Sequence, residues 1–494
     1  MTSTLAGLRA GRDAASAESL SGLAGHIGLV ELRLDGLMPA ELDVAGALEG
    51  RQLPVIVTCR PVWQGGGFNG SEAERLRILR DAARLGAEFV DIEMDAETRT
   101  PGAVAALAGE RGQARLVLSH HAFTPGVPKD LGARLRIMRA SAEALGRGSV
   151  TKIAITAERP RDCATLRRVA CGDRMPADAI AIAMGPAGVL SRLLPAKFST
   201  AWTYVGTAGH GQLSAEQALK RHRIVDATAA TRVFGIAGAP LSHSASPAMH
   251  AAAFAAAGID AVFVPVETAD AAELLEIADA LEFEGFAVTA PLKSRVFGRP
   301  HVHSDAAARE IGAINTLRRR AGDGWDGRNF DAPAFRGPLD AADVAVAGGR
   351  VVVLGAGGAA RAAVRELLAM GARVELSARD AVKGQALADE LGAAITSFPP
   401  TGRAALIVNA TPVGTAPQSG VTPIPAGLLH ADVAYDLVYN PEDTQFLQDA
   451  RADGARTIGG LAMLAAQASR QFEWWTGVRV DTSVFLRAAQ EFIR

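Results

Sequence analysis

The chain has 494 residues, more than one ordinary domain needs, and its 51 basic and 53 acidic side chains leave a formal net charge of only −2. This balance, without a long basic stretch, gives no sign of a nucleic-acid partner or an anionic membrane surface. No apolar run reaches the roughly 18 residues of a membrane span and no secretory signal pattern begins the chain, so we expect a cytoplasmic protein.

Cysteine usage agrees with that compartment. Cys59, Cys163 and Cys171 are odd in number and lack the spacing of metal ligands. We therefore expect structural thiols, no disulfide framework and no bound metal.

The first half of the chain alternates short runs rich in Val and Ile with helical stretches. One such stretch covers 71–86, where Ser71 is a candidate N-cap and the apolar residues recur at helix spacing. Seven runs are predicted as strands: 29–34, 55–60, 89–94, 115–121, 150–156, 179–184 and 198–205. Strand and helix alternation of this length favours a parallel α/β barrel, whose active residues lie at the C-terminal ends of its strands.

Polar residues on or just after these strands are candidates for such a site: Glu31, Arg33, Arg60, His121, Lys152 and Arg192. A lysine among apolar strands is desolvated, and arginines nearby would lower its pKa further, freeing its amine to attack a ketone. A histidine, with a usual pKa near about 6.5, can move the neighbouring proton. An arginine offers a planar fork to a carboxylate.

The strings that carry these residues resemble type I 3-dehydroquinate dehydratase over residues 1–222. They are Glu31-Leu32-Arg33, Thr58-Cys59-Arg60, Ser119-His120-His121, Lys152-Ile153-Ala154, Gly188 to Leu193 and Gly211-Gln212. The resemblance implies that His121 is the catalytic histidine and Lys152 the imine-forming lysine. It also implies a set of substrate-binding residues: Glu31, Arg33, Arg60, Arg192 and Gln212.

Three departures separate the chain from that family. Gln64 stands where the family commonly carries a carboxylate, so a charge that orients the histidine is absent. The lid string is Ala208-Gly209-His210-Gly211-Gln212 in place of the usual Ser-Ala-Pro-Gly-Gln. The family's first strand would fall before or within residues 1–5, so we expect an (β/α)8-type barrel whose first strand is short or missing, with open edges.

The second half carries a lysine, an asparagine and an aspartate ahead of a glycine turn. Lys293 ends Val288-Thr289-Ala290-Pro291-Leu292-Lys293, Asn315 precedes Thr316, and Asp331 follows Asn329-Phe330. Such groups can hold a polyhydroxy ring and move a proton beside a hydride donor.

These motifs, with the serine pair in Ser242-His243-Ser244-Ala245-Ser246, resemble shikimate dehydrogenase from about Phe234 to the C-terminus. The resemblance implies that Lys293 and Asp331 are catalytic. Its implied substrate-binding residues are Ser244, Ser246, Thr289, Asn315, Tyr439 and Gln467. The substrate lobe is expected over 232–340, with the C-terminal helices of 461–494 returning to it.

A Rossmann-like cofactor lobe is expected over 345–460. The strand 351–354 runs into Gly355-Ala356-Gly357-Gly358-Ala359 and then a helix to about Met370, whose N-terminus attracts a pyrophosphate. The expected cofactor contacts are Gly355, Gly357, Gly358, Ala359, Arg379, Lys383, Thr411 and Gly460.

The next strand ends at Ser377-Ala378-Arg379-Asp380, where the family's usual Asn-Arg-Thr grips a 2′-phosphate. Arg379 and Lys383 keep the basic character, whereas Asp380 could accept a ribose hydroxyl. We expect NADP in preference to NAD.

Taken together, the halves predict consecutive steps: dehydration of 3-dehydroquinate to 3-dehydroshikimate, then reduction to shikimate. Two alternatives stay open, an NAD-dependent quinate or shikimate dehydrogenase with an impaired barrel, and a metabolite sensor without catalysis. Cofactor preference, channelling and oligomeric state are not set by these patterns.

Overall fold

The computed structural model describes residues 4–10, 27–36, 43–146, 148–172, 179–206, 213–214, 217, 224, 227–425, 427–428 and 430–494, with backbone only for 4–10 and 27. The chain divides into two compact units, Met1–Thr231 with Leu275–Glu282, and Arg232–Leu274 with Phe283–Arg494. Within the described ranges, no helix is long and apolar enough to cross a membrane.

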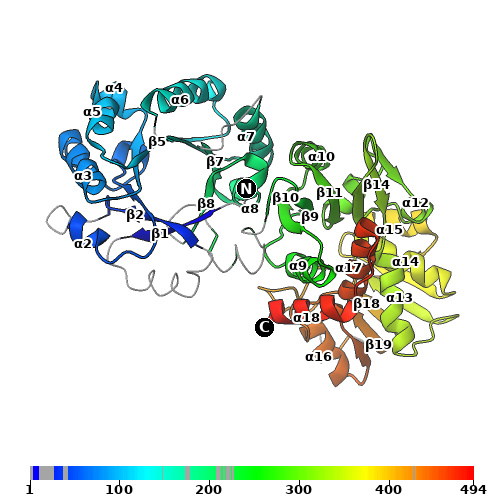
Figure 1. The fold of residues 1–494 in the computed structure, drawn as a ribbon. Helices are drawn as coiled ribbons and strands as arrows, with labels where there is room; N and C mark the ends of the chain where they lie inside the picture. Colours follow the sequence, from blue (N-terminus) through cyan, green and yellow to red (C-terminus); the bar gives the residue numbers. More distant parts are fainter. Residues whose placement is uncertain are drawn as a thin grey trace. The chain divides into compact units, whose positions relative to one another are not determined.

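The first unit is built on an eight-stranded parallel sheet in the order β7-β6-β5-β4-β3-β2-β1-β8. Figure 1 shows these strands curling into a ring with the helices outside it. The strands are β1 (Thr4–Ala10), β2 (Ile27–Arg33), β3 (Val55–Thr58), β4 (Phe89–Glu93), β5 (Arg115–Pro125), β6 (Val150–Thr156), β7 (Ala179–Met184) and β8 (Trp202–Val205). This α/β barrel confirms the expected fold class.

The expectation of a stub or missing first strand is wrong in one respect. β1 is a strand of seven residues that pairs with β2 on one side and β8 on the other. Its Thr-Leu-Ala-Gly-Leu-Arg-Ala composition is poor in β-branched and aromatic residues, which is why it was not recognisable as a strand. Among the described residues, an isolated bridge from Ala179 in β7 to Thr200, just before β8, is the link between these two strands.

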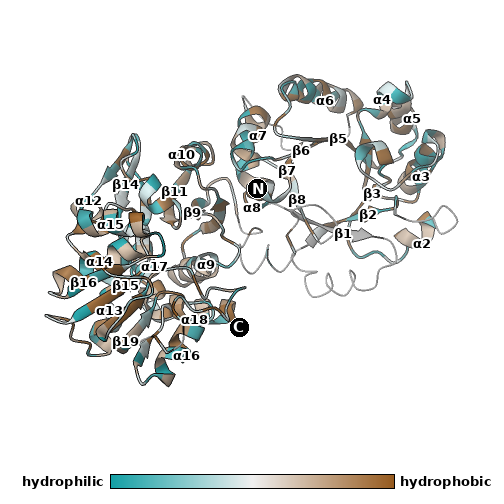
Figure 2. Cartoon of the chain, turned by 180° about the vertical axis from the view of Figure 1, so that it is seen from behind, coloured by the Kyte–Doolittle hydropathy of each residue, from teal (hydrophilic) through white to brown (hydrophobic). Residues whose placement is uncertain are grey.

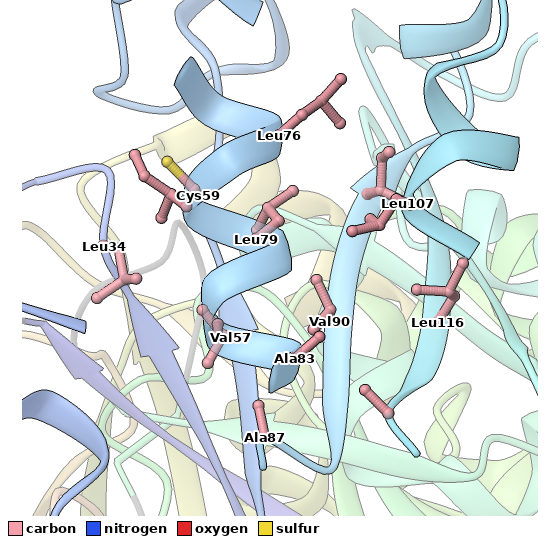
Figure 3. Close-up of a cluster of buried hydrophobic side chains, with 14 of the residues drawn as sticks. Leu34, Val57, Cys59, Leu76, Leu79, Ala83, Ala87, Val90, Leu107 and Leu116 are labelled. Carbon is pink, nitrogen blue, oxygen red and sulfur yellow. The ribbon is translucent and has the colours of Figure 1, made fainter. Parts of the chain in front are cut away.

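The helices pack an apolar stripe against the outside of the ring. Helix α3 (Glu72–Arg84) is capped by Ser71, whose hydroxyl accepts from the Glu74 amide. The helix buries Leu76 and Leu79 against Val57 and the neighbouring strands. Figure 3 shows this layer between α3, the strands and α5. In Figure 2 the same helices carry both hydrophilic and hydrophobic residues, as amphipathic helices do.

The remaining helices of this unit complete the strand–helix alternation. They are α2 (Val44–Leu48), α4 (Ala96–Arg99), α5 (Ala103–Glu110), α6 (Leu131–Leu145), α7 (Arg161–Cys171) and α8 (Val189–Leu193), with the 3-10 turns η2 (Val62–Gln64), η3 (Pro186–Gly188) and η4 (Pro195–Phe198). Phe198, expected in the last strand, lies in η4 because Pro195 starts a tight turn there.

The second unit holds two sheets. The substrate-lobe sheet has the order β10-β9-β11-β13-β14-β12. Its strands are β9 (Arg232–Gly238), β10 (Ala261–Glu267), β11 (Phe283–Val288), β12 (Val302–Ser304), β13 (Thr316–Arg319) and β14 (Trp325–Arg328). The helices in this stretch are α9 (Ser246–Ala257), α10 (Ala271–Ala280), α11 (Leu292–Arg295), α12 (Ala306–Ile311) and α13 (Asp331–Ala341). The returning helices α17 (Leu461–Thr476) and α18 (Thr482–Ile493) share an apolar core with α9.

The cofactor-lobe sheet is entirely parallel, in the order β17-β16-β15-β18-β19-β20. Its strands are β15 (Arg350–Leu354), β16 (Arg373–Ser377), β17 (Ala394–Ile395), β18 (Ala404–Asn409), β19 (Ala431–Asp436) and β20 (Arg456–Ile458), with helices α14 (Gly358–Ala369), α15 (Ala381–Leu391) and α16 (Gln445–Ala452). From β15 the chain adds β16 and β17 on one side, and then returns to place β18 on the other side of β15. Dinucleotides bind at this switch point in such folds. The Rossmann-like expectation is confirmed.

Candidate active sites

Lys152 stands inside the barrel, on β6, next to two carboxylates. Its Nζ lies 3.1 Å from Asp91 Oδ2 and 3.6 Å from Glu31 Oε1, and 4.6 Å from the ring centre of Tyr204. The register pairs Lys152 with Ser119 and Ala154 with His121, so alternation puts Lys152 and His121 on the same face of adjacent strands. The structure therefore brings the expected lysine and histidine together.

Arg60 ties the carboxylates of this site into one network. Its guanidinium donates to both oxygens of Asp91 at 3.1 and 2.9 Å, to Glu93 at 2.5 Å and to Ser119 at 2.8 Å. Arg75 holds the other oxygen of Glu93 at 2.6 Å. Because each buried charge has an opposite partner, the network can remain ionised inside the barrel.

The expected lowering of the Lys152 pKa is wrong for this arrangement. Burial lowers the pKa, but Glu31, Tyr204 and Asp91 together raise it above the usual value for a lysine. Asp91 Oδ2 lies within hydrogen-bonding distance of Nζ, whereas the charge of Arg60 is paired with Asp91 and Glu93. Lys152 thus rests as an ammonium and must lose a proton before it can attack a carbonyl.

His121 is positioned by Gln64, which stands where a carboxylate was expected. Gln64 Oε1 accepts from the His121 backbone amide at 3.0 Å and lies 3.2 Å from Nδ1. An amide oxygen can only accept, so Nδ1 carries the proton and Nε2 is left as a base. Burial, followed by the positive charges of Arg60 and Lys152, holds the pKa of His121 well below its usual value.

His120 faces a different neighbour, as strand alternation predicts. Its Nδ1 lies 2.7 Å from Asp95 Oδ2. The other carboxylate oxygen of Asp95 accepts from Arg134 at 3.2 Å. These contacts explain His120 as part of a structural ion-pair cluster.

The other expected residues of this site differ in their surroundings. Arg33 is bound by both oxygens of Asp35 at 2.8 Å. Arg192, on α8, is buried, and its Nε and Nη1 make no hydrogen bond in the described part of the chain. Burial lowers its pKa to about 10. An unpaired buried guanidinium suits an anionic ligand. Gln212 lies outside the described residues.

Sequence reasoning missed three residues that the fold brings to this site: Asp91, Glu93 and Tyr204. The signal for the first two was present, since carboxylates at alternate positions of the apolar strand β4 are unusual and require buried partners.

The second unit contains a cavity of about 730 Å³ between its substrate-binding and cofactor-binding sheets. Expected residues of both kinds line it: Ser244, Ser246, Thr289, Lys293, Asn315, Asp331, Ala359, Tyr439, Gly460 and Gln467. The cavity therefore collects most of the residues that the sequence assigned to one site.

Lys293 and Asp331 form the polar centre of this cavity. Lys293 Nζ donates to Asp331 Oδ2 at 2.6 Å, and Asn315 Nδ2 donates to the other oxygen at 2.8 Å. Gln467 Oε1 is 3.5 Å from the same amide nitrogen. The Phe330 backbone amide donates to Asn315 Oδ1 at 2.9 Å, which fixes the Asn315 amide. Asp331 thus holds Lys293 Nζ in place and is itself held by Asn315.

The glycine turn approaches this centre closely. Gly355 has a φ of +108°, a conformation that favours glycine, and a side chain there would meet Thr411. A Cβ on Gly358 would lie 3.0 Å from Lys293 Cβ and Cδ. Any larger residue at Gly358 would separate the start of α14 from Lys293.

The residues after β16 differ in how they are engaged. Asp380 caps α15, accepting from the Lys383 amide at 3.1 Å, and Lys383 Nζ lies 3.4 Å from its carboxylate. Arg379 is exposed and has no ion pair among the described residues. Asp380 is therefore occupied as a helix cap, while Arg379 remains available.

Gln471 and Met463 also line the cavity and were not anticipated. Gln471 donates to Thr316 Oγ1 at 2.9 Å and lies one helical turn after Gln467. That i, i+4 spacing on an apolar helix was the available signal.

The barrel with its buried lysine and the two-lobed unit with its dinucleotide turn define a class, a lyase joined to an oxidoreductase. Family models agree: type I 3-dehydroquinase matches residues 8–228, the shikimate dehydrogenase substrate binding domain residues 236–317, and the shikimate 5′-dehydrogenase C-terminal domain residues 460–490.

The chain is also similar to three known proteins. It is 30% identical to the chloroplastic bifunctional 3-dehydroquinate dehydratase/shikimate dehydrogenase of Arabidopsis thaliana, over 94% of this chain and 80% of the relative. It is 40% identical to a shikimate dehydrogenase (NADP(+)) of Anaeromyxobacter dehalogenans, over 53% of this chain and 97% of that one. The solved Thermus thermophilus shikimate 5-dehydrogenase with NADP(H) and shikimate is 36% identical, covering 53% of this chain and 100% of its own, with a TM-score of 0.49. The chain belongs to the bifunctional 3-dehydroquinate dehydratase/shikimate dehydrogenase family.

Proposed function

We propose that the barrel dehydrates 3-dehydroquinate to 3-dehydroshikimate and that the second unit reduces this product to shikimate with NADPH. Residues 1–222 would carry the first activity and residues 232–494 the second. The observation that carries the proposal is the pairing, in one chain, of Lys152 with His121 inside the barrel and of Lys293 with Asp331 in the cavity.

In the first step the substrate ketone forms an imine with Lys152. Arg192, a buried cation without a partner among the described residues, would bind the substrate carboxylate. The iminium draws electrons from the ring and makes the adjacent C–H acidic. His121 Nε2, left as an acceptor by the Gln64 contact to Nδ1, takes that proton and returns it to the departing hydroxyl.

In the second step a bound dinucleotide supplies the hydride. As the carbonyl oxygen gains negative charge, the Lys293 ammonium donates a proton to it, and Asp331 holds Nζ in position. Six polar side chains line the same cavity and offer hydrogen bonds to the other ring oxygens: Asn315, Ser244, Ser246, Thr289, Tyr439 and Gln467.

The residues present fit a dinucleotide. Gly358 lets the start of α14 lie against Lys293, which would bring the cofactor close to the acid. Five other expected cofactor contacts lie at the same turn or at the cavity beside it: Gly355, Gly357, Ala359, Thr411 and Gly460. Arg379 is exposed and has no ion pair among the described residues. We assign Arg379 to the 2′-phosphate of NADPH, with Lys383 a weaker contributor.

All three cysteines are free thiols, two of them buried. This usage supports residence in a reducing compartment such as the cytoplasm.

A coupled assay tests the proposal. Purified protein with 3-dehydroquinate and NADPH should oxidise NADPH, and NADH should be a poorer donor. Borohydride added with substrate should place ligand mass on the peptide that contains Lys152. Mass on another lysine, or none, would contradict the imine assignment; preference for NADH would favour the quinate or shikimate dehydrogenase alternative.

A further inference from the structure

Tyr204 is a buried tyrosine whose hydroxyl proton has no acceptor among the described residues. It lies on β8, is 3% exposed, and its hydroxyl makes no hydrogen bond within the described residues. The indole N–H of the nearby Trp202 can only donate, toward the phenol oxygen, so it cannot accept the Tyr204 proton. Leaving a buried donor unpaired destabilises the folded chain, and a phenylalanine at this position would avoid that cost.

Tyr204 belongs to the lysine site. Lys152 Nζ stands 4.6 Å from its ring centre, and the ring packs with Ile180 and Ile182 in the apolar layer around this lysine. The two nearby carboxylates are already engaged, Asp91 by Arg60, Ser119 and Lys152, and Glu31 by Thr58 at 2.7 Å. The phenol donates to neither of them, so its proton is available to a ligand.

We propose that Tyr204 is a further catalytic residue of the barrel, whose hydroxyl donates a hydrogen bond to the ketone oxygen that lies beside Lys152 during imine formation. This inference rests on the proposed dehydratase activity. It assigns different ligand groups to Arg192 and Tyr204, two of the buried donors of the barrel that lack a partner among the described residues. Arg192 is a cation and suits a permanent carboxylate, whereas a neutral phenol suits an oxygen that carries charge only transiently.

The chemistry of imine formation needs such a donor. When Nζ bonds to the carbonyl carbon, the C=O π electrons move to oxygen, which is then protonated and leaves as water. Starting from the ammonium, the C–N bond forms, the C–O bond breaks, and the two protons lost by Nζ leave on that water. Tyr204 neither gains nor loses a proton overall; it stabilises the oxygen while the charge develops.

The test compares Tyr204→Phe with Thr203→Val in the full-length chain. Thr203 is the adjacent buried residue of β8 and its hydroxyl is also unpaired among the described residues, but alternation directs it to the opposite face of the strand. Imine formation is followed by the rate of borohydride-trapped mass on Lys152 with 3-dehydroquinate. We expect Tyr204→Phe to slow trapping by at least about 10-fold, within the effect of losing one oxyanion donor. Thr203→Val should trap at the normal rate.

Two further readouts separate this role from a structural one. Tyr204→Phe should reduce 3-dehydroshikimate normally and melt no lower than the wild type, because it removes an unpaired polar atom. Normal trapping in Tyr204→Phe, slow trapping in Thr203→Val, or a drop in melting temperature with both activities would overturn the inference. Absence of trapping in the wild type would instead reject the dehydratase proposal itself.

Discussion

At His121, an amide takes the position expected for a carboxylate. Gln64 preserves the hydrogen bond that selects the tautomer, at 3.2 Å from Nδ1, but contributes no negative charge. Burial and the charges of Arg60 and Lys152 therefore keep the histidine neutral at pH values well below its usual pKa. Neutral His121 is the form needed to accept a proton.

We predict that Gln64→Glu raises the pKa of His121, because a carboxylate stabilises the imidazolium. Since the protonated histidine cannot act as a base, the acid limb of dehydratase kcat/KM should move to higher pH by roughly one unit. The control Gln64→Met removes the hydrogen bond without adding charge, and should lower turnover with no such movement. An unchanged limb in Gln64→Glu would show that His121 does not limit the profile.

Arg379 and Lys383 offer a matched pair for cofactor choice. Arg379 has no ion pair among the described residues, whereas Lys383 is 3.4 Å from Asp380. We predict that Arg379→Ala weakens NADPH binding by about 10- to 100-fold and NADH much less, as expected for a lost charge-assisted contact of about 1–3 kcal/mol. Lys383→Ala should have a smaller effect. Equal losses for both cofactors would exclude a role in reading the 2′-phosphate.

Among the elements, helix α9 packs a histidine into an aromatic cluster. His250 is fully buried, with Phe263, Trp475 and Phe485 at ring-centre distances of 4.3, 5.1 and 5.7 Å. Burial lowers its pKa to about 3. In the unfolded chain His250 gains a proton as the pH falls through about 6.5, whereas in the folded chain it stays neutral at that pH. The contribution of His250 to stability is therefore fully present above that pH and is lost as the pH falls below it.

For this helix we predict an acid-sensitive fold. Between pH 8 and pH 5, His250 should remove about 2 kcal/mol from the free energy of unfolding of the second unit. His250→Leu should abolish that part of the pH dependence, whatever its effect on stability at neutral pH. Tryptophan fluorescence during urea unfolding at each pH measures the free energy of unfolding, because Trp475 lies in the cluster. The same slope in wild type and variant would contradict the assignment.

At the scale of the whole molecule, the described residues form two candidate sites, each within one compact unit. The described residues of the lysine network lie in the first unit, and the residues that line the cavity lie in the second. Among the residues that the structure describes, none belongs to both sites. Each activity should therefore survive loss of its neighbour.

At this scale we predict complementation through solution. Lys152→Ala should abolish dehydration and keep reduction; Lys293→Ala should cut reduction by roughly 100-fold or more and keep dehydration. Mixing the two variants with 3-dehydroquinate should restore NADPH oxidation, because the intermediate can diffuse between chains. A mixture that stays inactive, with each single activity intact, would indicate obligatory transfer within one chain.

The sequence by itself determined the fold class, the order of the two enzymes and most candidate residues. Strand periodicity, the glycine turn after β15 and the ordered motifs around Lys152 and Lys293 are local patterns, and local patterns are readable because they depend on neighbouring residues. β1 escaped this reading because its composition is untypical of a strand, and pairing with β2 and β8 forms it regardless.

Only the tertiary structure decided the protonation of Lys152. The sequence shows a lysine on an apolar strand, for which burial predicts a lowered pKa, but not which side chains the barrel places around it. Asp91 comes from 61 residues away and stands 3.1 Å from Nζ. Charge interactions depend on distance through space, not along the chain. The pKa of Lys152 is therefore raised, where burial alone would lower it, once the barrel brings β4 and β6 together.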